Sequence, residues 1–423
     1  MTATIAFGAF DRHNLGDLLL AHVARASLGH GELQFAGLAA RDLRAVGGVA
    51  TRALHALPGL PAAGARLLHV GGEILTCTAR QAAVMLLARK DVEPTLSWLE
   101  RHPQAEAGWR RTMLGTEAEM PYVADARQLP GLAATCFAGV GGVGLDRLPA
   151  EARDAVIARL AAARAVGVRD RVTLSHLHAA GLAPRLVPDP VEQIAALFGD
   201  VIRARGAVPP VAAVRARFED GYLALQLASE FGDDATLDRL AQALSRLCAR
   251  NRLGLVLFQA GAAPWHDDAG VLYRLAARLP GGRAAVFDSI DAWDLCALLA
   301  HARVCASTSL HAFIVAGAFA VPAVAMQLSE DGEHAAKLQA YLQTWHSMEA
   351  GSTCGPDQLG AAIEHALQVP AALRESEARC RAVACRDGFE ALMRRRRAAP
   401  SLLIPLGGRR RQRRRLGVLI TLC

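Results

Sequence analysis

Short aliphatic runs alternate with longer stretches of helical periodicity along most of this 423-residue chain. That alternation is typical of repeated βα units, whose buried parallel strands read as near-continuous runs of small aliphatic residues. Apolar residues make up 52% of the chain and aromatic residues only 5%, so Ala, Leu and Val must build the core. The pattern therefore predicts an α/β protein with helices packed on parallel sheets.

The chain length predicts two domains. A single domain of 423 residues would be unusually large, whereas two of roughly 200 residues are common. The segment Phe198–Arg217 contains two glycines and two prolines and separates two series of βα units. We predict Rossmann-like, doubly wound domains over residues 1–200 and 210–390, followed by an Arg-rich, disordered tail over residues 391–423.

The predicted strands are short and aliphatic. In chain order they are Thr4–Phe10, Leu67–Val70, Ala134–Ala138, Ala165–Val168, Arg185–Val187, Tyr222–Leu227, Leu253–Gln259, Ala284–Phe287, Val304–Ala306 and Ala323–Met326. The predicted helices between them include Leu18–Leu28, Ala79–Leu87, Ala150–Ala163, Ala235–Arg250, Ala269–Ala277, Ala292–Ala300, Ala312–Ala320 and Gly355–Leu367.

The net charge of +7 comes from the C-terminal tail. Residues 394–423 hold ten arginines and no acidic residue, so the rest of the chain is slightly acidic. Arginine runs bind nucleic acid or anionic lipid by counterion release. No aromatic residue interleaves these arginines and no nucleic-acid module precedes them. We therefore expect no nucleic-acid partner and leave a peripheral membrane contact open.

The nine cysteines show no CxxC pair and no His/Cys cluster at zinc spacing. Scattered cysteines of this kind indicate reduced thiols in the cytosol, and we predict no metal site. The stretch Val304–Gln327 is largely apolar, but Ser307, His311 and Pro322 would make it a costly membrane helix. With no export signal visible at the N-terminus, we expect a cytoplasmic protein.

Polar residues and glycines gather where the predicted strands end. In parallel α/β sheets, ligands bind beyond the carboxyl ends of the strands. The candidates are Asn14, Gly16 and Asp17, then Gly71, Gly72 and Glu73, then Arg169 and Asp170, then Asp189, and finally Ser307, Thr308, Ser309, His311 and Gln327. We expect these residues to form the functional site.

The loop after the first strand opens a helix. Asn14 or Asp17 would cap that helix, either instead of or in addition to contacting a ligand. Gly16 would let the backbone approach a ligand closely.

Two further candidates suit an anionic ligand. The turn Ser307–Ser309 precedes an apolar helix whose free amides make an anion site, with His311 beside it. A buried structural histidine is the alternative. Arg169 would fork onto a carboxylate or phosphate, or else pair with Asp170 at the surface.

The run Gly139–Gly144 has the GxGxxG spacing of a dinucleotide-binding loop. Leu145 to Pro149 intervene before the next predicted helix, so a pyrophosphate would lack the helix N-terminus that normally holds it. We therefore reject dinucleotide binding.

Seven motifs in one order make the chain resemble the polysaccharide pyruvyl transferases. They are Asn14-Leu15-Gly16-Asp17, His69-Val70-Gly71-Gly72-Glu73, Gly139-Val140-Gly141, Val166-Gly167-Val168-Arg169-Asp170 with Ser175, Asp189-Pro190, Ser307-Thr308-Ser309-Leu310-His311 with Val321-Pro322, and Lys337. The resemblance covers residues 5–340. It departs at Ser309, where many members have arginine, and in the first loop, which lacks the glycine and aromatic residues often found there.

The resemblance implies a fold similar to the two-domain GT-B glycosyltransferases. It also implies transfer of the pyruvyl group of phosphoenolpyruvate to two hydroxyls of a sugar, releasing phosphate and forming a cyclic ketal. The acceptor would be a polysaccharide or its lipid-linked oligosaccharide precursor, near the inner face of the membrane. Phosphoenolpyruvate is a substrate here, and no cofactor is expected.

The resemblance further implies that Arg169, His311 and Lys337 bind the donor, although Lys337 could equally be a solvated helix residue. Histidine exchanges protons near pH 7, so we assign His311 as general acid/base, with Asp17 or Glu73 as companion base. The remaining predicted substrate-binding residues are Asn14, Gly71, Gly72, Glu73, Ser307 and Ser309.

Two other functions stay open. A GT-B glycosyltransferase using a nucleotide-sugar would need an acid for the nucleoside, and Glu330, Asp331 and Glu333 lie in a suitable place. A non-catalytic relative would only bind a glycan or another partner. The acceptor sugar and the oligomeric state are not determined by these patterns.

Overall fold

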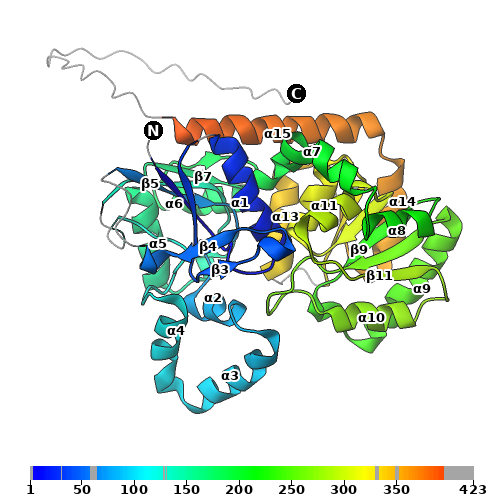
Figure 1. Cartoon of the computed structure of the whole chain (residues 1–423), viewed down its shortest axis with the longest axis horizontal. Helices are drawn as coiled ribbons and strands as arrows, with labels where there is room; N and C mark the ends of the chain where they lie inside the picture. The colour runs from blue at the N-terminus through cyan, green and yellow to red at the C-terminus, as the bar shows by residue number, and fades with distance from the viewer. Residues whose placement is uncertain are drawn as a thin grey trace.

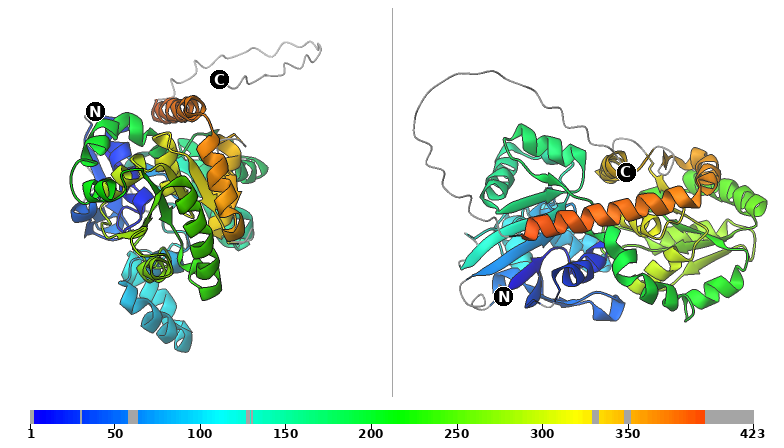
Figure 2. Two further views of the ribbon diagram at one scale, coloured as in Figure 1. Left: turned by 90° about the vertical axis from the view of Figure 1, so that its right-hand side faces the viewer. Right: turned by 90° about the horizontal axis from the view of Figure 1, so that it is seen from above.

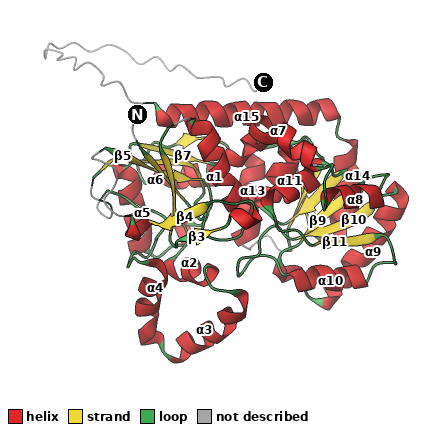
Figure 3. Ribbon diagram, viewed as in Figure 1, coloured by secondary structure: helices red, strands yellow, loops and turns green. Residues whose placement is uncertain are grey.

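The computed structural model describes residues 3–29, 31–57, 64–126, 129, 131–328, 333–347 and 352–394. Two α/β domains lie side by side, each with helices on both faces of a sheet (Figures 1 and 3). The predicted class, an α/β protein with two domains built on parallel sheets, is confirmed.

The first domain contains an eight-stranded sheet in the order β3-β4-β2-β1-β5-β6-β7-β8. Its strands are β1 (Thr4–Phe7), β2 (Leu33–Gly37), β3 (Arg41–Asp42), β4 (Ala50–Ala53), β5 (Ala65–Val70), β6 (Leu132–Val140), β7 (Ala165–Val168) and β8 (Arg185–Leu186). Every pairing is parallel except β3 with β4. The sequence predicted β1, β5, β6, β7 and β8, and missed the three short strands at the other edge.

The second domain contains a six-stranded, fully parallel sheet in the order β11-β10-β9-β12-β13-β14. Its strands are β9 (Tyr222–Gln226), β10 (Gly254–Phe258), β11 (Ala284–Phe287), β12 (Val304–Ser307), β13 (Ala323–Met326) and β14 (Ser352–Cys354). The five strands predicted for this half are confirmed, and only β14 was missed.

Helices cover the faces of both sheets. The α-helices are α1 (Leu15–Leu28), α2 (Ala79–Met85), α3 (Arg89–Arg101), α4 (Glu106–Leu114), α5 (Ala150–Ala162), α6 (Arg171–Ala179), α7 (Ile194–Arg205), α8 (Val211–Arg217), α9 (Asp234–Asn251), α10 (Ala269–Ala277), α11 (Ala292–Ala300), α12 (Leu310–Ala318), α13 (Glu333–Trp345), α14 (Leu359–Gln368) and α15 (Ala371–Met393). Short 3-10 turns are η1 (Arg44–Val46), η2 (Leu54–Ala56), η3 (Pro103–Ala105), η4 (Leu145–Arg147), η5 (Pro190–Gln193), η6 (Ser229–Phe231) and η7 (Pro356–Gln358).

In both sheets, the order in which strands are added reverses beside the central strand. In the first, the chain leaves β1 for β2 on one side and later returns to β5 on the other. In the second, β10 and β12 flank β9 in the same way. Ligands of doubly wound sheets bind at such switch points, so the loops after β1, β5, β9 and β12 are the ones to inspect.

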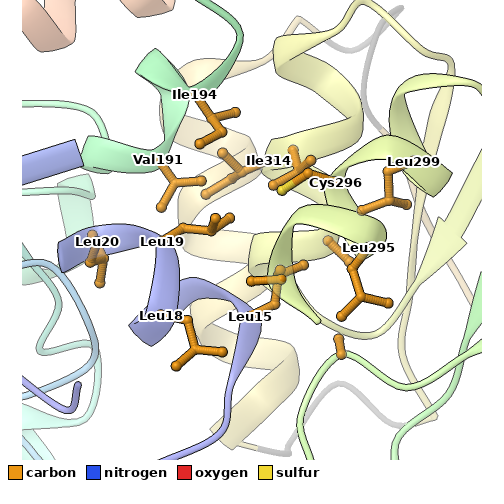
Figure 4. Close-up of a cluster of buried hydrophobic side chains, with 14 of the residues drawn as sticks. Leu15, Leu18, Leu19, Leu20, Val191, Ile194, Leu295, Cys296, Leu299 and Ile314 are labelled. Atoms are coloured by element: carbon orange, nitrogen blue, oxygen red, sulfur yellow. The ribbon is translucent and has the colours of Figure 1, made fainter. Parts of the chain in front are cut away.

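A continuous apolar core joins the two domains. Leu15 and Leu19 of α1 pack against Leu295 of α11 and Ile314 of α12, together with Ile194 of α7 (Figure 4). All five side chains are fully buried. Small, polar contacts between domains permit relative motion by default, whereas a large hydrophobic interface opposes it. This seam therefore holds the two domains in one relative orientation.

The segment predicted as the boundary between the domains is helical. Phe198–Arg217 contains most of α7 and all of α8, and α7 packs on both α1 and α11. Residues 371–390, predicted to belong to the second domain, lie in a helix, α15, that continues to residue 393 and crosses both domains (Figure 2). Its end lies on the first domain, where Leu392 packs against Gly167 of β7.

The end of the chain lies largely outside the described residues. Of the predicted Arg-rich tail, residues 391–394 complete α15 and cap it, and residues 395–423 are not described. Among the described helices, none has both the length and the apolar character needed to cross a bilayer.

Candidate functional site

The loops at the two switch points line one cleft of about 190 Å³ between the domains. Most of the predicted site residues contribute to its wall. They are Asn14, Asp17, Gly72, Glu73, Arg169, Thr308, Ser309, His311 and Lys337. The strand-end argument therefore brought together residues that are up to 297 positions apart, from Asn14 to His311.

Two predicted site residues lie behind the wall. Gly71 adopts φ +57°, donates its N–H to Ala138 O at 2.9 Å and leaves room for the side chain of Leu20. Ser307 is fully buried, and its hydroxyl donates to Gln226 Oε1 at 2.6 Å. Both residues therefore shape the wall without facing the cleft.

Arg169 is buried between two carboxylates. Its Nη1 donates to Asp189 Oδ2 at 2.9 Å, and its Nη2 donates to Glu73 Oε2 at 2.7 Å. A side chain at Gly141 would overlap this Glu73–Arg169 pair, so the second glycine of the Gly139–Gly144 run makes room for it. The sequence predicted that Arg169 binds an anionic ligand, but the carboxylates of Glu73 and Asp189 already bind its guanidinium.

The alternative prediction, that Arg169 pairs with Asp170 at the surface, is wrong. Asp170 caps α6 instead, accepting from Thr173 N at 2.7 Å and from Thr173 Oγ1 at 2.9 Å. Helix α5 begins at Ala150, after the 3-10 turn η4. The glycine run Gly139–Gly144 therefore does not lead directly into a helix, as predicted when dinucleotide binding was rejected.

Asp189 connects Arg169 to His311. Its Oδ2 lies 3.4 Å from His311 Nε2, and its Oδ1 accepts from Val191 N at 3.0 Å to cap η5. Burial alone would raise the pKa of Asp189, but the neighbouring His311 and Arg169 lower it to about 2. Asp189 therefore carries a full negative charge beside the imidazole.

His311 packs on Gly16 across the domain boundary. A Cβ at position 16 would overlap the imidazole ring, so only glycine permits this contact. The close approach predicted for Gly16 exists, but the approaching group is His311 and not a ligand. Asn14 caps α1 by accepting from Gly16 N at 3.1 Å, and its backbone forms a bridge to Gly261.

Gln226 organises the opposite wall and was missed by the sequence analysis. Its Oε1 accepts from Ser307 Oγ, from Thr308 N at 3.0 Å and from Ser309 N at 2.9 Å. Ser309 is the N-cap of α12 and accepts from Ala312 N. Gln226 thus holds the turn that presents the α12 N-terminus to the cleft.

Asp267, also missed, lies behind Gln226. Its Oδ1 accepts from Gln226 Nε2 at 2.8 Å, and its Oδ2 accepts from Ala260 N at 2.6 Å and Gly261 N at 3.2 Å. Burial raises the pKa of Asp267 to about 7, because these neutral donors only partly offset the loss of solvation. This wall is consequently close to neutral.

Arg12 is a third functional candidate that was not predicted. It lines the cleft and is buried, with Nε 3.4 Å from Asp17 Oδ2 and Nη1 3.2 Å from Met85 Sδ. A thioether is a weak acceptor. Arg12 is therefore less fully neutralised by protein groups than Arg169.

Lys337 lies on α13, which Trp345 ties to the first domain by donating to Arg169 O at 2.7 Å. Of the acids considered for a nucleoside, Glu330 and Asp331 lie outside the described residues, as does the side chain of Glu333. In the part of the chain that is described, no group of His, Cys, Asp and Glu side chains is arranged to hold a metal ion.

Three solved structures have the same fold over nearly their whole length. They are UDP-GlcNAc 2-epimerase of Methanocaldococcus jannaschii with UDP-GlcNAc and UDP (TM-score 0.50, 10% identity, covering 90% of this chain and 98% of that one), UDP-GlcNAc 2-epimerase of Neisseria meningitidis bound to UDP-GlcNAc (0.52, 9%, 93% and 99%) and the S. aureus MnaA–UDP complex (0.51, 13%, 92% and 93%). At such identities the similarity concerns the fold alone. It confirms the expected GT-B-like pair of domains.

No curated protein sequence matches the chain. The model of the family described as "Polysaccharide pyruvyl transferase" matches residues 139–329, a stretch that contains Arg169, Asp189, Gln226 and His311. Over these residues, the resemblance seen in the sequence is confirmed. Residues 139–329 thus carry the sequence pattern of the polysaccharide pyruvyl transferase family.

Proposed function

We propose that this protein transfers the pyruvyl group of phosphoenolpyruvate to two hydroxyls of a sugar, leaving a cyclic ketal. One observation carries the proposal. His311 stands at the start of α12, 3.4 Å from the Asp189 carboxylate, in a cleft that also contains Arg12, Arg169 and Lys337. A proton-exchanging group beside a cationic, partly enclosed surface suits a small anion whose reaction needs proton transfer.

The donor carries a carboxylate and a phosphate, with about three negative charges near neutral pH. The free amides at the start of α12 favour an anionic group, in the manner of other helix N-termini. Arg12 and Lys337 add positive charge to the same cleft. Because Glu73 and Asp189 already neutralise Arg169, we assign it to orienting the site and Arg12 to contacting the donor.

The reaction balances without an oxidant or reductant. One sugar hydroxyl adds to the enol carbon while the methylene carbon accepts a proton and becomes a methyl group. The second hydroxyl then replaces phosphate at the same carbon, and the phosphate leaves with the remaining proton. His311 would supply the proton to the methylene carbon and then remove a hydroxyl proton, since imidazole works in both directions near pH 7.

The companion base is better assigned to Asp17 than to Glu73. Glu73 uses Oε2 for Arg169 and Oε1 to accept from Val143 N at 2.7 Å. Among the described residues, the one side-chain group that hydrogen-bonds to Asp17 is Arg12, at 3.4 Å, and Asp17 lines the cleft. Asn14, Gly72 and Ser309 complete the proposed substrate contacts from the two domains.

The test is phosphate release from phosphoenolpyruvate across a panel of free and lipid-linked sugar acceptors. We expect release only when a diol acceptor is present, together with a product heavier by one pyruvate ketal in mass spectrometry. Phosphate release without a ketal product would contradict the proposal. We place the reaction in the cytoplasm, with lipid-linked acceptors presented at the inner face of the membrane.

A nucleotide-sugar reaction is the second candidate, because the solved structures that share this fold include complexes with UDP and UDP-GlcNAc. Thermal stabilisation by UDP- or GDP-sugars and none by phosphoenolpyruvate would favour it. A non-catalytic glycan-binding role would be supported by acceptor binding without any turnover of either donor.

A further inference from the structure

Trp265 has an unusual backbone for a bulky residue. Its φ is +62°, in the left-handed region that large side chains rarely adopt. Two other non-glycine residues among those described have positive φ, Arg252 and Ala320, and both directly follow helices. Trp265 ends no α-helix. Such a strained residue persists only where its surroundings hold it, and it often marks a functional site.

The loop that carries Trp265 is fastened from inside. Asp267 accepts from the amides of Ala260 and Gly261, and Gln259 Nε2 donates to the carbonyl oxygens of Gly261 at 3.3 Å and Asp267 at 3.1 Å. These bonds close the loop on both sides of the tryptophan. Its position is therefore set before any ligand arrives.

The first domain fastens the same loop from outside. The His13 ring accepts from Ala262 N at 3.1 Å, and His13 O accepts from Ala263 N at 3.1 Å. Arg89, at the start of α3, donates to the carbonyl oxygen of Asp267. The loop thus joins the two domains at the edge of the cleft.

Despite this rigid support, the indole itself is exposed. Trp265 lines the cleft and keeps 43% of its surface accessible. Exposing a large aromatic ring on a strained, firmly held loop brings no benefit in burial. It does provide a flat apolar surface at low entropic cost, because its loop is already held in place.

We propose that Trp265 is the stacking platform for the acceptor, a pyranose ring of the sugar that receives the ketal. A pyranose has one face rich in C–H groups and hydroxyls around its edge, which fits an indole beside polar groups such as Asn14 and Asp17. The donor is charged at both ends and has no comparable apolar face. This assignment rests on the proposed function, because it assigns the second substrate to the same cleft.

The kinetic test compares Trp265→Ala with Trp265→Phe in the phosphate-release assay. We expect W265A to raise the apparent KM for the acceptor about tenfold, the effect of losing one aromatic contact. The apparent KM for phosphoenolpyruvate should stay the same, and W265F should recover most of the loss. Trp98→Ala is the matched control, since Trp98 on α3 is equally exposed, at 42%, and does not line the cleft. An unchanged acceptor KM in W265A, or a W265F as poor as W265A, would overturn the assignment.

A binding test separates this inference from the reaction itself. Methyl glucopyranoside, methyl galactopyranoside, methyl mannopyranoside and UDP are each mixed with wild type and W265A, without phosphoenolpyruvate, and followed by saturation-transfer NMR. We expect transfer to pyranoside ring protons in wild type and its loss in W265A. Such binding without phosphoenolpyruvate turnover would keep the platform and remove the proposed reaction. Turnover of phosphoenolpyruvate together with pyranoside binding that W265A leaves unchanged would keep the proposed reaction and remove the platform. Absence of pyranoside binding to wild type, or Trp265-dependent binding of UDP alone, would overturn the inference.

Discussion

Each wall of the cleft contains a buried aspartate, and the two have opposite pKa shifts. Asp189, on the first-domain side, has a pKa lowered to about 2, because His311 and Arg169 offset the effect of its burial. Asp267, on the second-domain side, has a pKa raised to about 7 by burial among amide donors. The same side chain at similar burial is thus charged in one wall and near neutral in the other. The difference teaches that neighbouring charge, and not depth, sets the polarity of this site.

The contrast also divides the work of the site. The charged wall contains Glu73, Arg169 and Asp189 of the first domain, and the imidazole of His311, from α12 of the second domain, lies against it. The neutral wall contains Gln226 and the hydroxyl-rich turn, whose Thr308 and Ser309 amides donate to Gln226. In the proposed reaction, His311 beside the charged wall would exchange protons, while Arg12 and the start of α12 would contact the anionic donor.

The largest expected effect is the pH dependence that Asp267 imposes on stability. Its folded-state pKa of about 7 lies above its ordinary value of 3.8, so its stabilising contribution is complete below pH 3.8 and is lost as pH rises through 7. The shift corresponds to about 4 kcal/mol. We expect the unfolding free energy from urea titrations to fall over this window in wild type and to fall much less in Asp267→Asn. An equal slope in both proteins would show that Asp267 is ionised throughout.

Removing a charge from the charged wall should lower the unfolding free energy slightly less than the ionisation of Asp267 does. Asp189→Asn removes the charge between Arg169 and His311 and leaves a buried guanidinium with one carboxylate, at an expected loss of about 3 kcal/mol near pH 7. Urea unfolding measures the change. Asp357→Asn breaks an ion pair with Arg239 that is largely exposed, and this control should lose less than about 0.5 kcal/mol. Similar losses for the two variants would refute the contrast between buried and surface pairs.

His311→Ala should reduce turnover by ~10²-fold or more, the usual scale for acid–base catalysis. Gly16→Ala tests the same ring without removing it, because the new methyl group overlaps the imidazole and must displace it. We expect G16A to lower kcat while thermal unfolding shows a folded protein. Gly360→Ala is the matched control, since a Cβ there meets no other atom within 4 Å. Turnover near that of wild type in H311A would remove His311 from the mechanism.

Arg12→Gln should give the smallest effect, a rise of about tenfold in the apparent KM for phosphoenolpyruvate. The reason is that Arg12 pairs with one carboxylate, Asp17, at 3.4 Å, whereas Arg169 pairs with two at shorter distances. Arg12 is therefore better able to contact the donor. Arg80→Gln provides the control, because its ion pair with Glu106 lies on the partly exposed surface. If R12Q leaves the donor KM unchanged, the donor binds through other groups.

The sequence located much of the site because strand ends are readable. Unbroken aliphatic runs mark buried strands, and the polar residues after them, such as Glu73, Arg169 and His311, must lie at one edge of a parallel sheet. Gln226 was missed because the predicted strand Tyr222–Leu227 ran one residue past it. Asp267 and Trp265 were missed because they lie on a loop, where no periodic pattern distinguishes a structural residue from a functional one.

Local pattern by itself determined the α/β class, the succession of βα units and the motifs of the family, since each depends on residues near one another in the chain. Only the tertiary structure decided which charges meet. It bound Arg169 to two carboxylates, placed His311 on Gly16 of the other domain, and gave two aspartates opposite pKa shifts. These outcomes depend on distance and burial in space, because electrostatic and packing energies act through contacts that sequence separation does not reveal.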